Sequence, residues 1–239
     1  DRVAAELSVI DTASGAVSSI PLPNGSTSVN DVALSPDGSQ VFVVHNIARF
    51  MVPTTQVEKG WMNTAALTLV DAARRAVTAT VLLDDVVRGA ANPSRVLCTT
   101  DGAALLVLHQ GTHELSVISR EALQKKLAAV SNRGGLPDEL NFLSGLRKRI
   151  PLGGQGLRSL AVGGGRAWAA GYYTGTLHAV DLANGAVTTV ALQPGFTPSQ
   201  AWRGEMLFHD AKLCFQQWQS CASCHPAGRV DGMNWDLLN

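Results

Sequence analysis

The sequence predicts a mainly β fold of the β-propeller type, in which units of four antiparallel strands repeat around an axis. Two observations support this prediction. Strand-like hydrophobic segments recur in two alternating patterns, with Asp-Gly turns between them. The composition, 46% hydrophobic and 16% charged, supplies a buried core. A length of 239 residues suits one large all-β domain or two smaller ones.

In the first pattern, a β-rich run ends near an Asp, small turn residues follow, and a second β-rich run begins. Its copies are at 7–17, 67–77, 115–119 and 177–187. In the second pattern, a β-rich run leads through a turn into another hydrophobic run; its copies are at 32–45, 96–109 and, degraded, 160–171. Gly tolerates positive φ, so Asp37-Gly38 and Asp101-Gly102 predict tight hairpins. Like positions recur every roughly 50–65 residues, longer than a usual blade because loops are inserted.

Two helices are expected outside the strands. Residues 120–130 predict one, with Ser119 as its cap and Glu121 paired with Lys125. Residues 131–137 then interrupt it. After Leu192 the composition changes. We expect a linker at 193–198 and a second helix to about residue 210, with Thr197 as its cap and Pro198 at its first position.

The clearest chemical motif is Cys221-Ala-Ser-Cys224-His225. With four Cys and six His in the chain, the number of Cys-x-x-Cys-His motifs expected by chance is about 0.002. Two thiols at this spacing add to the two vinyl groups of one haem, and the adjacent His reaches the iron as axial ligand. We therefore predict one covalent haem c, with Cys221 and Cys224 as anchors and His225 as iron ligand. The sequence identifies no catalytic residue.

Other interpretations of the motif stay open. A redox dithiol is one, and a zinc site completed by Cys214 and His209 is another. The sixth iron ligand is undetermined; the residues considered are Met206, His209, Met233, His45, His109 and His178. The tryptophans Trp202, Trp218 and Trp235 are expected to wall the haem or to relay electrons. Cys98 and Cys214 are expected as buried or free thiols, with a 98–214 disulfide as the alternative.

His45 and His109 close equivalent strands of successive repeats. We expect them to emerge on the same face of the propeller, either as polar ends of exposed strands or as ligands for a haem or second metal. Asp37, Asp101 and Asp181 are assigned to turns rather than to catalysis.

Residues 1–192 resemble the YVTN-type β-propeller, in which a strand pair "(V/I)xD…G" alternates with "SPDG…(Y/F)V". About four blades' worth of sequence is present, an incomplete set, because propellers close with typically 4–8 blades. Further blades are expected on the N-terminal side. The chain starts at Asp1 and is interpreted as processed or as a fragment.

Residues 199–239 resemble the start of a cytochrome domain of the bacterial di-haem cytochrome c peroxidase and methylamine-utilisation family. The matching segments are 202–210, 221–226, 228–232 and 235–239, and segments 43–50 and 60–64 fit the branch with a YVTN-like propeller. The resemblance implies that Cys221, Cys224 and His225 hold haem and that Arg203, Phe208 and Asp210 are framework. It also implies a second haem in sequence not present here, and hence a short α-helical c-type cytochrome segment after the propeller.

The functional prediction is an extracytoplasmic c-type haem protein, periplasmic or at the cell surface, that transfers electrons. In the complete protein it would belong to a di-haem peroxidase-like oxidoreductase. Its partner would be a redox protein or a small electron donor or acceptor, and the propeller would be a docking platform. The alternative is a propeller that binds a ligand or protein, with a regulatory or structural haem.

Charge and hydropathy argue against nucleic acid as a partner and against a membrane-spanning segment. Lys+Arg and Asp+Glu both number 19, without a basic cluster, which argues against nucleic acid. No apolar run reaches the roughly 18–20 residues that span a bilayer.

Overall fold

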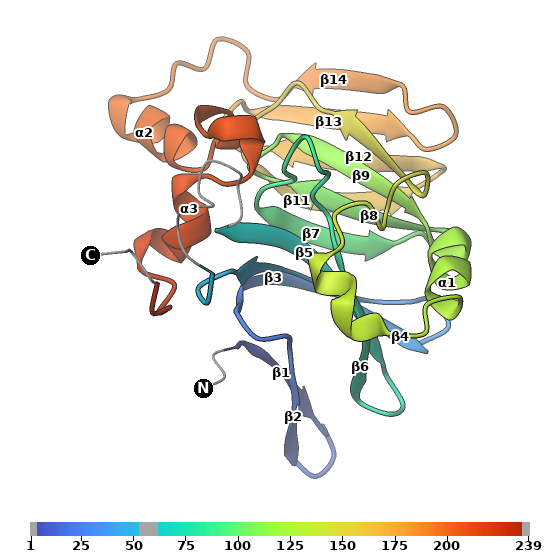
Figure 1. The fold of residues 1–239 in the computed structure, drawn as a ribbon. Coiled ribbons are helices and arrows are strands. Elements are labelled where there is room, and N and C mark those ends of the chain that lie inside the picture. Colours follow the sequence, from blue (N-terminus) through green and yellow to red (C-terminus); the bar gives the residue numbers. More distant parts are fainter. Residues whose placement is uncertain (1–3, 53–61, 236–239) are drawn as a thin grey trace.

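A computed structural model describes residues 4–52 and 62–235. In these residues a two-stranded hairpin is followed by three sheets of four antiparallel strands, each in chain order (Figure 1). The hairpin joins β1 (Glu6–Ile10) and β2 (Val17–Pro21). The first sheet contains β3 (Ser26–Leu34), β4 (Gln40–Ala48), β5 (Asn63–Asp71) and β6 (Ala76–Leu82). The second contains β7 (Pro93–Cys98), β8 (Ala104–His109), β9 (Glu114–Ser119) and β10 (Arg147–Pro151). The third contains β11 (Leu157–Gly163), β12 (Arg166–Gly171), β13 (Thr176–Asp181) and β14 (Val187–Ala191).

The predicted Asp-Gly hairpins are confirmed. Gly38 and Gly102 both have φ of +71°, the left-handed region that glycine enters without strain. The Asp37 carboxylate accepts a hydrogen bond from the Ser39 N–H at 3.1 Å, and Asp101 accepts one from Ala103 N–H at 3.0 Å. Hydrogen bonds from the Thr99 hydroxyl, at 2.6 Å, and from Ala103 N–H hold the pKa of Asp101 below its usual value, and the aspartates act in turns as expected.

The three sheets stack face to face in a propeller-like fan, with the first strands β3, β7 and β11 as neighbours (Figure 1). Aliphatic and aromatic side chains fill both interfaces. The first core includes Phe42, Leu67 and Leu105, and the second includes Leu108, Leu157 and Val180. The fold is therefore mainly β and propeller-like. About four blades were expected; the described residues contain three complete sheets and the β1–β2 hairpin.

The helices are few and short. Helix α1 (Arg120–Ala128) begins where the sequence predicts, because the Ser119 hydroxyl accepts a hydrogen bond from Ala122 N–H at 3.3 Å. A 3₁₀ helix, η2 (Arg133–Asp138), follows it. None of the helices in the part of the chain that the structure describes has the length and apolarity needed to cross a bilayer.

Helix α2 (Gln200–Phe208) corrects one prediction. Its cap is Ser199, whose hydroxyl accepts a hydrogen bond from Trp202 N–H at 3.2 Å. Thr197 and Pro198 lie before the helix. The helix therefore starts two residues later than predicted, because the hydroxyl of Ser199, and not that of Thr197, caps its first turn.

Candidate haem-attachment site

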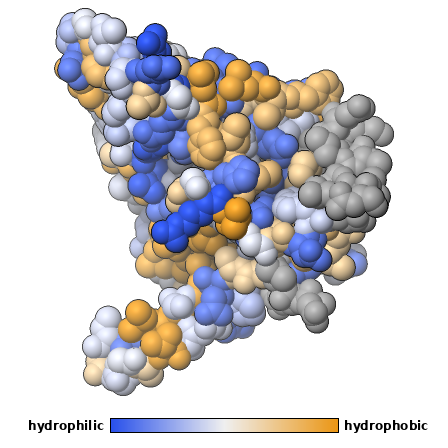
Figure 2. Space-filling model, turned by 90° about the vertical axis from the view of Figure 1, so that its left-hand side faces the viewer, coloured by the Kyte–Doolittle hydropathy of each residue, from blue (hydrophilic) through white to orange (hydrophobic). Residues whose placement is uncertain are grey.

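The segment after α2 lies against the blades on the side opposite α1 (Figure 1). It contains the short helices η3 (Ala211–Leu213), η4 (Phe215–Gln217), α3 (Cys221–Cys224) and η5 (Pro226–Gly228). Backbone hydrogen bonds fix it: Ala211 N–H donates to Gly111 O at 3.0 Å, and Gly89 N–H donates to Gln216 O at 2.9 Å. Figure 2 views this side, where hydrophilic and hydrophobic residues are interspersed.

The two motif cysteines are the first and last residues of α3, a single helical turn. Ser220 precedes the turn, and the Ser223 hydroxyl accepts a hydrogen bond from Ser220 N–H at 3.0 Å. Asn92, in the loop before β7, clamps both serines. Its amide nitrogen donates to Ser220 Oγ at 2.5 Å, and its amide oxygen accepts from Ser223 Oγ at 2.6 Å. All three side chains are buried, so the propeller itself holds the turn.

The two motif thiols have different surroundings. Cys221 is exposed, whereas Cys224 is partly buried and its sulfur accepts a hydrogen bond from the Asn63 amide at 3.1 Å. Burial raises the pKa of the Cys224 thiol to about 11. Cys224 is therefore almost entirely the neutral thiol at neutral pH, and Cys221 is the more accessible sulfur of the two. All four cysteines are free, so the 98–214 disulfide is not formed.

His225 follows the turn with an exposed ring. Its Nδ1 lies 2.8 Å from the carbonyl oxygen of Arg229, so Nδ1–H donates and Nε2 carries the free lone pair. Metal-ligating histidines in proteins are held in this way, with one nitrogen on a carbonyl and the other on the metal. This hydrogen bond fixes the ring and leaves Nε2 without a partner among the described residues.

A pocket of about 320 Å³ opens beside Cys224 and His225. Its other lining residues are Met62, Val230, Asp231, Gly232, Met233 and Trp235. The Trp235 ring is fixed by a hydrogen bond from Nε1 to Asp231 at 2.9 Å. This mostly apolar lining suits one edge of an apolar macrocycle, which is the part of a haem that a pocket of this volume can cover. Met233, one of the residues considered as sixth ligand, lies in the same pocket as His225.

The structure does not bring together the ligands of the alternative zinc site, which would be completed by Cys214 and His209. No group of three or more His, Cys, Asp or Glu side chains in the described residues is placed to hold a metal ion. His209 instead lies with Nδ1 3.1 Å from the Tyr173 hydroxyl and 3.0 Å from the Glu205 carbonyl oxygen. Of the other tryptophans, Trp218 is buried and Trp202 packs on Tyr172 with ring centroids 4.7 Å apart.

His45 and His109 were expected either as polar ends of exposed strands or as ligands for a haem or second metal. Both predictions are wrong, because the two rings are buried inside the blades. His45 Nε2 lies 2.7 Å from Thr68 Oγ1, and His109 Nε2 lies 2.9 Å from Ser116 Oγ. His178 is buried likewise, with Nδ1 2.9 Å from Thr189 Oγ1. Burial lowers the pKa of His45 and of His109 to about 4. A hydroxyl on the next strand of each blade partners the ring, so these histidines are structural.

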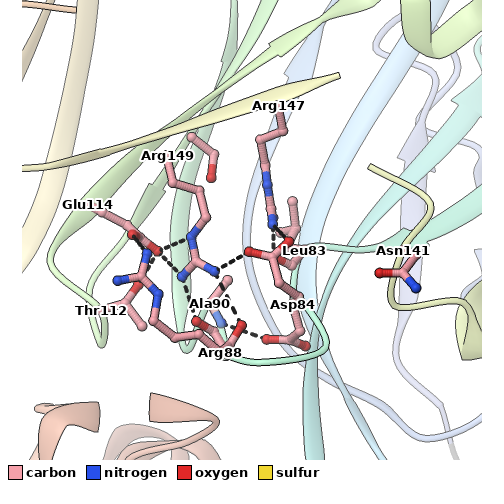
Figure 3. A network of polar contacts seen from close by, with 12 residues as sticks. Leu83, Asp84, Arg88, Ala90, Thr112, Glu114, Asn141, Arg147 and Arg149 are labelled. Atoms are coloured by element: carbon pink, nitrogen blue, oxygen red, sulfur yellow. Dashed lines mark hydrogen bonds and ion pairs between the residues drawn. The ribbon is translucent and has the colours of Figure 1, made fainter. Parts of the chain in front are cut away.

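A polar network that sequence reasoning missed joins loop residues 84–90 to β9 and β10 (Figure 3). Asn92 follows in the same loop. Arg149 pairs with Asp85 at 2.6 Å and donates from Nε to Glu114 at 2.9 Å, and Arg147 also pairs with Asp85. Asp84 accepts hydrogen bonds from two backbone N–H groups, Ala65 and Ala90, both at 2.7 Å. Burial raises the pKa of Asp84 to about 7. One sequence feature could have indicated this network. Arg147 and Arg149 are two residues apart in one strand, so their side chains lie on the same face of the sheet.

The framework residue Asp210 also contacts a blade. Its carboxylate lies 3.0 Å from His113 Nε2, accepts from the Gln155 amide at 3.2 Å, and caps η3 through Lys212 N–H at 2.9 Å. His113 was not singled out from the sequence. Segments 60–61 and 236–239 of the family resemblance lie outside the described residues.

Comparisons with known proteins support the fold and leave the family open. No protein-family model matches. The chain is 26% identical over 183 residues to hydrazine synthase subunit beta of Kuenenia stuttgartiensis, a match that covers 73% of this chain and 46% of the relative. The solved hydrazine synthase of that organism superposes with a TM-score of 0.65 at 23% identity, covering 78% of this chain and 51% of that one.

A second solved structure, virginiamycin B lyase from Staphylococcus aureus, superposes with a TM-score of 0.50 at 12% identity. It covers 79% of this chain and 50% of that chain. At these identities the structures show a shared fold alone. The chain spans about half the length of the relatives it matches. Its fold is a β-propeller fold similar to that of the hydrazine synthase beta subunit.

Proposed function

We propose that this chain carries a covalent haem c at Cys221 and Cys224, with His225 as axial ligand, and transfers electrons. The observation that carries the proposal is the orientation of His225. Its Nδ1–H bond to Arg229 leaves Nε2 free beside an apolar pocket, one residue after a clamped Cys-x-x-Cys turn. Bound haem supplies an iron that gains and loses one electron.

The protein residues have distinct tasks in this proposal. Cys221 and Cys224 anchor the macrocycle, and Asn92 fixes the turn through Ser220 and Ser223. Arg229 orients the ring of His225 through its carbonyl oxygen. We further propose that the whole protein is a peroxidase-like oxidoreductase with a second haem beyond residue 239, and that it works in the periplasm or at the cell surface.

The relative named a subunit of hydrazine synthase supports a docking role for the propeller. A protein that works as a subunit contacts partner chains, and we propose that this propeller docks a redox partner. A propeller whose haem is only structural or regulatory is the second proposal, favoured by the burial of Ser220 and Ser223 against the blades.

The first test measures haem attachment after expression with a c-type maturation system. We expect the intact mass to rise by about one haem and the pyridine haemochrome to show a c-type band. The double variant Cys221→Ala, Cys224→Ala removes both signals, and the matched control Cys98→Ala keeps them. An unmodified mass and no haem band in the parent chain would sink the proposal.

A redox titration of the loaded protein then separates the two proposals. A reversible one-electron couple with rapid exchange to a soluble donor supports electron transfer. An inert haem in a protein that binds a partner tightly supports the structural or regulatory role.

A further inference from the structure

We propose that a polar groove beside the attachment turn binds a small anion, a carboxylate or oxyanion of a few non-hydrogen atoms. The groove consists of two cavities, of about 190 and 80 Å³, that share Asn30 and Gln110 in their linings. The larger is also lined by Ser94, Arg95 and Arg158. The smaller is also lined by Ser28, Asn46, Asn92, His209, Ala222 and Pro226, among others.

Three blades contribute to this groove, each through its first strand. Asn30 comes from β3, Arg95 from β7 and Arg158 from β11. The first strands of a propeller lie nearest its axis, so residues far apart in sequence converge there. Two guanidinium groups from neighbouring blades thus line one small cavity.

The charges around the groove favour an anion. Arg95 donates only to backbone carbonyls, Asn30 O at 3.4 Å and Ser94 O at 3.2 Å, and forms no ion pair with the described part of the chain. Arg158 pairs with Glu205 at 3.0 Å and donates to the Tyr173 hydroxyl. It also donates from Nη2 and Nε to the Gln110 amide oxygen at 3.2 and 3.0 Å. The Glu205 carboxylate thus neutralises Arg158, and the described residues supply no carboxylate to Arg95. Arg95 is therefore the cation that is available to an anion. An Arg fork without a carboxylate matches a planar carboxylate or an oxyanion through paired hydrogen bonds.

The adjoining cavity also offers a hydrogen-bonding group to a bound molecule. The Ser28 hydroxyl is buried there and has no hydrogen-bond partner within residues 4–52 and 62–235. Buried hydroxyls normally form hydrogen bonds, so this hydroxyl can bond to a polar group bound in the cavity. The volumes of the two cavities suit a ligand of a few non-hydrogen atoms.

The groove also adjoins the attachment turn, because Ala222 and Pro226 line its smaller cavity. The arginine-lined cavity is thus separated from the turn by the smaller one, and the nearness of a bound anion to haem rests on the proposed function. Anion binding itself needs only the polypeptide. The two ideas fail separately: the haemochrome spectrum tests the haem, and anion titration of the unmodified chain tests the groove.

The test is isothermal titration of the purified chain with acetate and, separately, with acetamide, which has the same shape without the charge. We expect saturable one-to-one binding of acetate, with acetamide at least about tenfold weaker. Arg95→Gln should weaken acetate binding at least about tenfold. The control Arg166→Gln removes an equal charge at an exposed position on β12 and should leave the affinity unchanged.

A third variant protects the test against misfolding. Arg95→Lys keeps the positive charge but lacks the guanidinium fork. An acetate affinity between that of the parent and that of Arg95→Gln supports anion binding in the groove. Equal binding of acetate and acetamide overturns the proposal. So does equal loss of affinity in Arg95→Gln and Arg166→Gln, which would mean general charge attraction.

Discussion

Asn92 joins the propeller to the attachment turn through one side chain, which bonds both Ser220 and Ser223. Its φ of +54° is one that Asn tolerates and that Gly adopts freely. Asn92→Gly therefore removes the amide without adding backbone strain.

We expect Asn92→Gly to lower the free energy of unfolding by about 1–3 kcal/mol, because it strands buried hydroxyls. Urea denaturation measures this. The thiol of Cys224 should also react faster with a thiol reagent in the unmodified chain. Asn92→Asp keeps two acceptors for the serine hydroxyls and serves as control; equal reactivity in both variants would contradict the clamp.

At the scale of elements, the C-terminal segment packs on the blades through a close backbone approach. A Cβ built on Gly89 would lie 2.4 Å from the Trp218 Cα and 2.5 Å from the Gln217 oxygen. Such contacts are far inside van der Waals distance, so only glycine fits.

Gly89→Ala should push this segment away from the blades, since the three nearest atoms all belong to the backbone and cannot rotate aside. Hydrogen exchange should then speed up in residues 210–225 while the sheets keep their protection. Gly135→Ala, where an added Cβ meets no atom within 4 Å, is the matched control. Unchanged exchange in Gly89→Ala would show that the segment does not depend on this contact.

At the scale of the whole molecule, buried histidines link stability to pH. His45 and His109, in two different blades, have pKa values lowered to about 4, whereas an unfolded chain protonates histidine near 6.5. The unfolded state therefore binds more protons between these values, and stability falls as pH drops from about 6.5 to 4. Each ring contributes up to about 1.4 kcal/mol per pH unit.

The double variant His45→Gln, His109→Gln should lose less stability than the parent across this window, as urea titrations at several pH values would show. Asp84 acts in the opposite direction, because its raised pKa of about 7 makes protonation favour the fold. Both proteins retain Asp84, so their difference isolates the histidines. Parallel curves would contradict the assignment.

Local patterns in the sequence determined much of this molecule. Strand alternation and Asp-Gly turns fixed the mainly β class and the hairpins at Gly38 and Gly102, because these features depend on neighbours along the chain. The Ser119 cap was predictable for the same reason. The Cys221–His225 motif is equally local, and its haem assignment rests on spacing.

Only the tertiary structure decided what surrounds these residues. The burial of His45 and His109, the clamp at Asn92 and the convergence of Arg95 with Arg158 all join segments of different strands or blades. Such contacts depend on which strands pair and how sheets stack, and a linear pattern does not encode those distances. The sequence by itself thus determined the repeat and the motif, whereas the packing of blades decided which polar side chains are structural and which line a site, because burial and partner geometry exist only after the sheets assemble.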